Sequence, residues 1–155
     1  SLFAEVNEGV KAYKVGKHQH TPEIEQELSL AVRKPVVITF TPHLIPMNRG
    51  ILATIYATLQ GTATQDDVQQ CYRSFFGGCG FVRICPPGIV PATHQVRGSN
   101  YCDIGFVIDK RTNRLIIVSA LDNLLKGGAG QAVQNMNIMA GFEEDAGINQ
   151  LPLFP

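Results

Sequence analysis

The chain has 155 residues, 45% of them apolar, and its thirteen basic and thirteen acidic residues cancel to a formal net charge of zero. This length and composition predict one soluble globular domain with its own core. No apolar run approaches the roughly 20 residues that span a bilayer, and no basic stripe with interleaved aromatic residues is present, so we expect neither a membrane nor a nucleic acid as a partner. The sequence starts abruptly at Ser1 without a secretory signal. We therefore expect a chain cut from a longer protein.

The four cysteines follow no spacing that is typical of a redox or zinc site. Cys71, Cys79, Cys85 and Cys102 lie too far apart for a C-x-x-C pair, and the four histidines supply no matching spacing. A chain of this length does not need disulfides for stability. We therefore predict free thiols, a reducing compartment and no metal site.

Residues 17–28 place two imidazoles and a carboxylate around a predicted helix start. Thr21 is a suitable N-cap, Pro22 suits the first helical position, and Glu23 falls in the first turn, where the helix dipole favours negative charge. In the extended segment before the helix, His18 and His20 point to the same side. The helix N-terminus disfavours an imidazolium and Glu23 favours one, which suits proton transfer near neutral pH. A capped surface helix with two solvated histidines remains the alternative. The predicted inward face comprises Ile24, Leu28, Ala31 and Val32.

The middle of the chain alternates predicted strands and helices. Residues 35–41 and 51–59 predict strands, separated by an irregular crossing that contains two prolines and a glycine. Thr64 and Asp67 resemble a capping box, and the helix that follows ends at Gly77-Gly78. Its apolar stripe includes Cys71, which we expect in the core.

The C-terminal half predicts a hairpin and a closing helix. Residues 81–85 form a short strand and 89–100 a loop. The strands 102–108 and 114–120 then pair as an antiparallel hairpin. The last helix spans 127–140 and stops at Gly141. Its polar positions carry no charge, which indicates that a second surface covers this side of the helix, and the Gly-rich start could approach a ligand. An ordinary amphipathic helix that closes the sheet remains the alternative. Its predicted apolar face comprises Ala129, Ala132, Val133, Met136, Met139 and Ala140.

This order of elements predicts an α+β fold. We expect a mixed, largely antiparallel sheet of about five to seven strands, with helices on one face. The open face should pair with a second subunit.

Four segments together resemble the C-terminal half of the N-acetyl-gamma-glutamyl-phosphate reductase family: residues 17–28, 41–50, 96–102 and 121–135. The resemblance implies a domain like the C-terminal domain of glyceraldehyde-3-phosphate dehydrogenase, formed by residues 1–155. In the family an upstream Rossmann domain binds NADPH, and the final helix, 127–140, is expected to pack toward it. Neither that domain's G-x-G-x-x-G nor the family's nucleophile motif is present here.

The resemblance also implies the chemistry. A cysteine thiolate attacks an acyl-phosphate substrate, phosphate leaves, and hydride from NADPH gives N-acetylglutamate 5-semialdehyde in arginine biosynthesis. The family assembles as a dimer or tetramer in the cytoplasm, or in plastids in plants. The alternatives are an aminoadipate-branch reductase, an aspartate-semialdehyde dehydrogenase, and a non-catalytic dimerisation fragment.

The resemblance implies three groups of site residues. In the catalytic group, His18 matches the position of the family's catalytic histidine, and His20 and Glu23 belong to the same constellation. The substrate-binding group is Arg49 and, more weakly, Arg97; the cofactor-binding group is Asn123, Gly127 and Gly128.

Overall fold

The computed structural model describes residues 7–153 and divides the chain into two units, residues 1–48 and 49–155. Each unit is described by itself. The abrupt start at Ser1 and the lack of a secretory signal concern residues 1–6, which lie outside the described residues. A single domain over residues 1–155 therefore stays a prediction.

The first unit contains helix α2, which begins two residues earlier than predicted. It spans His20–Val32, and its N-cap is Gln19. Thr21 is therefore not the N-cap, and its buried Oγ1 has no hydrogen-bond partner. Glu23 does lie in the first turn. A two-stranded antiparallel ladder, β1 (Lys11–Ala12) with β2 (His43–Leu44), completes the unit.

The prediction of a strand over residues 35–41 is wrong. The segment is extended, but the described residues include no strand paired with it. Two side chains of α2 accept its N–H groups instead: Ser29 Oγ accepts from Val36 at 2.9 Å, and Glu25 Oε1 accepts from Ile38 at 3.0 Å. The alternating sequence satisfies two of its backbone donors on a helix, and no described strand edge pairs with it.

The predicted inward face of α2 is also wrong within this chain. None of the residues that the structure describes in α2 is buried. Leu28 is 40% exposed and Val32 is 50% exposed. The apolar stripe is present in the sequence, but the described residues supply too little surface to cover it.

The second unit is built on a four-stranded mixed sheet in the order β3-β6-β5-β4, as counted over residues 49–153. β4 is parallel to β5 and the other two pairings are antiparallel, which confirms the predicted fold class. The hairpin of β5 and β6 is confirmed, while the number of strands in this sheet is below the five to seven predicted. The strands are β3 (Ile51–Thr58), β4 (Val82–Ile84), β5 (Cys102–Asp109) and β6 (Arg114–Leu121).

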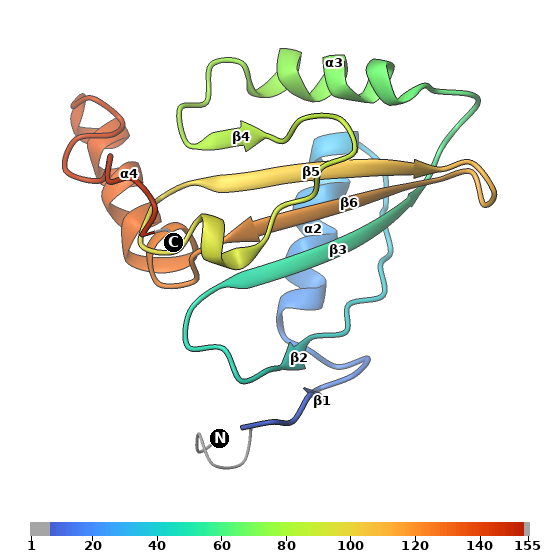
Figure 1. Cartoon of the computed structure of the whole chain (residues 1–155), viewed down its shortest axis with the longest axis horizontal. Coiled ribbons are helices and arrows are strands. Elements are labelled where there is room, and N and C mark those ends of the chain that lie inside the picture. Colours follow the sequence, from blue (N-terminus) through green and yellow to red (C-terminus); the bar gives the residue numbers. More distant parts are fainter. Residues whose placement is uncertain (1–6, 154–155) are drawn as a thin grey trace. The chain divides into compact units, whose positions relative to one another are not determined.

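Helix α3 (Gln65–Phe76) covers one face of the sheet, and the core lies beneath it (Figure 1). Val68 packs there with Phe106 and Leu115, which are 2% and 8% exposed. The capping box of Thr64 and Asp67 is confirmed, with Thr64 Oγ1 accepting from the Asp67 N–H at 3.1 Å.

The prediction that Cys71 lies in the core is wrong, because its side chain is exposed. Helix α3 contacts the sheet along the line of Val68 and Tyr72, and Phe75 is 78% exposed. The periodicity placed these residues on one stripe, but the narrow contact with the sheet buries only part of it.

The closing helix buries the side opposite to the one predicted. A short π-helical turn, η2 (Leu125–Ala129), leads into α4 (Gly130–Ala140), which lies at the end of the sheet where β5 begins (Figure 1). Its polar residues Gln134 and Asn137 are buried, whereas Met136 and Met139 are 53% and 87% exposed. The apolar face does not close the sheet, and Gly141 ends the helix in the left-handed conformation as predicted.

Hydrogen bonds within the unit explain the uncharged polar side of α4. Gln134 Oε1 accepts from Asn100 Nδ2 at 2.9 Å and from Lys126 Nζ at 2.7 Å. Asn137 Nδ2 donates to the carbonyls of Glu144 and Ala146. Amide side chains suit this position because each supplies both a donor and an acceptor without a charge to bury.

A short 3-10 turn, η1 (Thr93–Gln95), lies in the loop before β5. Over residues 7–153, no helix combines the length and the hydropathy needed to cross a bilayer.

Candidate functional site

The predicted site residues fall into two groups, one in each unit. His18, His20 and Glu23 belong to the first unit. Arg49 and Arg97 belong to the second, together with Asn123, Gly127 and Gly128. The structure brings residues together within each group, and each group is described by itself.

His18 lies inside a small aromatic cluster of the first unit. Its side chain is 7% exposed, and its ring makes edge contacts with Tyr13, His20 and Phe40 at centroid distances of 5.4, 4.8 and 5.2 Å. Nδ1 of His18 accepts from the His20 backbone N–H at 3.1 Å. A neutral imidazole that accepts at Nδ1 carries its proton on Nε2, so His18 has one fixed tautomer.

The surroundings keep His18 uncharged near neutral pH. Desolvation lowers the pKa of the imidazole, and the positive charges of His20 and Lys14 lower it further, while Glu23 opposes them. His20 differs because its side chain is exposed, although its ring touches that of His18. The two histidines therefore offer a fixed neutral ring beside an accessible one. Glu23 is exposed in the first turn of α2.

In the second unit the fully buried carboxylate of Asp122 organises the surroundings of Arg49. Its Oδ2 accepts from Arg49 Nη2 and from the Gly98 N–H, both at 2.8 Å. Its Oδ1 accepts from the N–H groups of Leu124 and Leu125 at 2.9 and 3.2 Å. Burial alone would raise the pKa of Asp122, but these hydrogen bonds outweigh it and lower the pKa. The carboxylate is therefore ionised at neutral pH.

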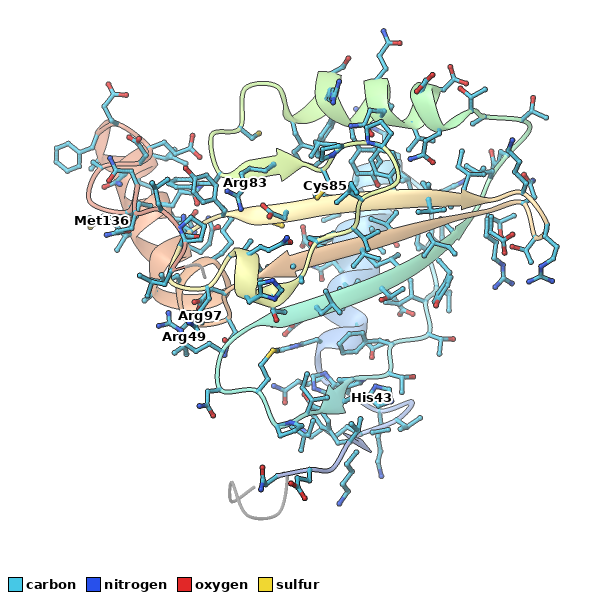
Figure 2. The ribbon with its side chains drawn as sticks, in the orientation of Figure 1. His43, Arg49, Arg83, Cys85, Arg97 and Met136 are labelled. Carbon is cyan, nitrogen blue, oxygen red and sulfur yellow. The ribbon has the colours of Figure 1, made fainter. Side chains whose placement is uncertain are left out.

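The substrate-binding candidates lie at one end of the sheet. Arg49, directly before β3, is 33% exposed at its side chain and keeps accessible surface beside the ion pair. Arg97 is exposed and precedes Gly98, whose N–H binds Asp122. Figure 2 labels Arg49 and Arg97 at the end of the sheet where β3 begins. Two cations at one place are suited to an anionic ligand.

A pocket of about 490 Å³ opens beside Arg49. Most of its wall is apolar, and the guanidinium supplies a cationic part. This combination suits a small anion with an apolar portion. The wall includes Gly98, Leu125, Val133, Ile148 and Leu151.

The cofactor-binding candidates line the turn before α4. Asn123 Oδ1 accepts from the Gly50 N–H at 2.7 Å, which fixes the amide and leaves its NH2 group to donate elsewhere. The Gly127 N–H donates to the Asp122 carbonyl at 2.9 Å. Gly127 and Gly128 are exposed, so the backbone here is open to close approach by a ligand. Among the described residues, no group of three or more His, Cys, Asp or Glu side chains is arranged to hold a metal ion.

A known family matches most of the chain. The family described as "Semialdehyde dehydrogenase, dimerisation domain" matches residues 1–123. The chain belongs to this family. The order of predicted motifs and the mixed sheet are consistent with the match.

This chain spans less than half of the length of similar curated proteins. N-acetyl-gamma-glutamyl-phosphate reductase of Geobacter metallireducens is 61% identical over 156 residues, covering all of this chain and 45% of the relative. The proteins of the same name from Pelobacter propionicus and Desulfotalea psychrophila are each 60% identical with the same coverage. The match is to the C-terminal part of these proteins, so this chain spans about half the length of the relatives, and the predicted resemblance is confirmed.

Solved structures confirm the fold. Aspartate semialdehyde dehydrogenase of Francisella tularensis superposes with a TM-score of 0.68 at 15% identity, covering 87% of this chain and 40% of that one. Aspartate semialdehyde dehydrogenase II of Vibrio cholerae gives a TM-score of 0.64, also at 15% identity, covering 81% and 38%. At this identity the likeness concerns the fold alone.

The sequence analysis did not single out Asp122, although it directly follows β6 in the segment that carries the family resemblance. The available signal was an acidic residue at the end of an apolar strand, directly before a helical turn, where a carboxylate can accept free N–H groups. That signal predicts a cap, but it does not predict the bond to an arginine 73 positions earlier in the chain, which only the fold creates.

Proposed function

We propose that this chain is the substrate-binding and dimerisation half of an NADPH-dependent N-acetyl-gamma-glutamyl-phosphate reductase. The observation that carries the proposal is 61% identity over the whole chain to a protein of that name. The substrate is a small acyl phosphate, the product is the semialdehyde, and the enzyme acts in the cytoplasm.

His20 is the proton-transfer group in this proposal, and His18 orients it. His20 is exposed, so its ring is accessible to a substrate or a thiol. His18 is neutral, with Nδ1 held by the His20 N–H, and its ring contacts His20. The charge of Glu23 acts on the His18 ring in the direction that favours an imidazolium, and Glu23 lies three residues after His20 in α2.

Arg49 and Arg97 bind the anionic groups of the acyl phosphate. A guanidinium meets carboxylate or phosphate oxygens with two parallel donors. Arg49 has Nη2 on Asp122 and a buried Nε, and the exposed third of its side chain remains accessible to the substrate. The apolar wall of the adjacent pocket suits the uncharged part of the substrate.

The cofactor candidates fit a bound NADPH, which supplies the hydride. Asn123 presents its amide NH2 because Gly50 occupies the amide oxygen. Gly127 and Gly128 have no side chain to obstruct the ligand, and the Gly127 N–H is held by Asp122. These residues make a secondary contact surface, since the main cofactor site belongs to an upstream Rossmann domain in this proposal.

Two exposed apolar surfaces support the assembly. The outer side of α4 carries Met136, Ile138 and Met139, of which Met136 lies on the side facing away from the sheet (Figure 2). We assign this side to contact with the Rossmann domain. The edge strand β3 exposes Leu52 and Tyr56 at 51% and 63%, and we assign it to pairing with a second subunit in a homodimer or tetramer.

A chimera tests the proposed function. The C-terminal part of the Geobacter metallireducens reductase that matches this chain is replaced by residues 1–155. We expect NADPH-dependent reduction of N-acetylglutamyl phosphate by the chimera and no turnover by residues 1–155 alone, because these residues contain neither a G-x-G-x-x-G nor the family's nucleophile motif. Aspartyl phosphate and the aminoadipate analogue serve as competing substrates.

Substitutions in the chimera separate the two histidines. His20→Ala should lower kcat by roughly 10²-fold to 10⁴-fold because general acid–base catalysis is lost. His18→Gln keeps an acceptor for the His20 N–H and should cost less. A folded but inactive chimera, or a preference for one of the competing substrates, would contradict the proposed activity. An unchanged kcat for His20→Ala would move the role to His18.

A further inference from the structure

Asp122 bonds to three separate segments of the second unit's site. The side chain is fully buried. It accepts four hydrogen bonds, from Arg49, Gly98, Leu124 and Leu125, at 2.8, 2.8, 2.9 and 3.2 Å. These donors lie before β3, in the loop before β5, and in the turn before α4.

Each of these donors is a candidate site residue or lies close to one in sequence. Arg49 is the substrate-binding candidate itself, Gly98 follows Arg97, and Leu124 follows Asn123. The Asp122 carbonyl also holds the Gly127 N–H. One buried residue thus connects Arg49 and the Gly98 backbone to the glycine turn.

We propose that Asp122 is a positioning residue, which fixes the Arg49 guanidinium relative to the Gly98 loop and the Leu124–Leu125 turn so that Arg49 can bind the acyl phosphate. This inference rests on the proposed function. It assigns a role to a residue that would act on the ligand only through Arg49, with which it forms an ion pair.

Charge and donor geometry explain why a carboxylate occupies the position. Four donors converge on two oxygens, and a carboxylate accepts at both without carrying a proton of its own. An asparagine would turn one of these oxygens into an NH2 donor that faces Arg49 and Gly98. Three backbone donors share the negative charge, so Arg49 is oriented but not fully neutralised. The Arg49 side chain remains one-third exposed for a ligand.

A double-mutant cycle in the chimera tests the inference. The variants are Asp122→Asn, Arg49→Ala and the combination of both, and the measured quantities are KM for the acyl phosphate and kcat. Asp122→Asn should raise KM by about tenfold with a smaller change in kcat, because it removes binding shared by the ground and transition states. In the Arg49→Ala background the same change should leave KM unaltered, because Asp122 acts through Arg49.

Asp103 provides a matched control. It is 7% exposed and makes a bidentate ion pair with Arg83 at 2.6 and 2.9 Å in the same sheet. Asp103→Asn should lower stability without raising KM, as expected for a purely structural carboxylate. If Asp122→Asn does not fold, Asp122→Ser replaces it, since serine is smaller and still accepts from the Leu124 N–H.

The outcomes are distinct. An inactive unmodified chimera overturns the proposed function and this inference with it. If the chimera is active but the Asp122 and Arg49 substitutions change KM by independent factors that multiply in the double variant, the inference is overturned and the proposed function stands. An unchanged KM for a folded Asp122 variant does the same. Non-additive KM effects, absent for Asp103→Asn, support it.

Discussion

Gly130→Ala should destabilise the second unit, although the same change usually strengthens a helix. Gly130 is the first residue of α4 and is buried. A Cβ at this position would collide with Asn100 Oδ1 and lie 2.9 Å from the carbonyl carbon and oxygen of Leu125. The backbone of Leu125 cannot rotate away as a flexible side chain can, so the neighbouring turn has to move.

The opposing contributions have known sizes. Alanine gains about 1 kcal/mol over glycine in a helix interior. Overpacking costs about 1–3 kcal/mol. Displacing Asn100 also breaks its 2.9 Å bond to Gln134, and a buried amide left without a partner costs about 1–3 kcal/mol. The costs exceed the gain, and the net loss is about 1–5 kcal/mol.

Urea denaturation of the chain, followed by circular dichroism, measures the effect. Gly78→Ala is the matched control, because nothing lies within 4 Å of its added Cβ and its φ is negative. We expect the control to be neutral or slightly stabilising. A midpoint for Gly130→Ala that equals or exceeds that of the unmodified chain would refute the close packing of Asn100 against α4.

Two further predictions concern the first unit and the assembly. The His18 imidazole should titrate below its ordinary value of about 6.5 in NMR spectra, and Phe40→Ala should move the midpoint upward by admitting water. Since the pKa of His18 is lowered in the folded state, the unfolded chain binds more protons. The stability contributed by neutral His18 is therefore lost as the pH falls from about 6.5 through the folded pKa. A titration midpoint of His18 at its ordinary value would contradict the desolvation. Sedimentation should show concentration-dependent association that Tyr56→Lys weakens, because the lysine places a charge on the exposed edge strand. A clean monomer over a wide concentration range would count against pairing through β3.

Local sequence determined much of the secondary structure. The capping box of Thr64 and Asp67 starts α3 as predicted, because both partners lie three residues apart and need no tertiary context. The alternation over residues 102–108 and 114–120 gave the correct hairpin because its register depends on a short turn. The motifs around His18 and Asn123 were specific enough to indicate the family. Their roles as site residues stay predictions.

Contacts between distant segments decided the rest. Residues 35–41 have the alternation of a strand, yet a strand needs an adjacent edge, and here side chains of α2 take the N–H groups instead. The helix period of α4 was correct, but period alone does not say which side faces inward. The buried side is the polar one, because Asn100, Lys126 and Glu144 converge on Gln134. The order of predicted elements thus determined the fold class, and the resemblance of four segments indicated the family. Only the tertiary structure decided two features. The ion pair of Asp122 with Arg49 joins residues that are far apart in the sequence. The apolar side of α4 is exposed because contacts with other segments bury the polar side instead.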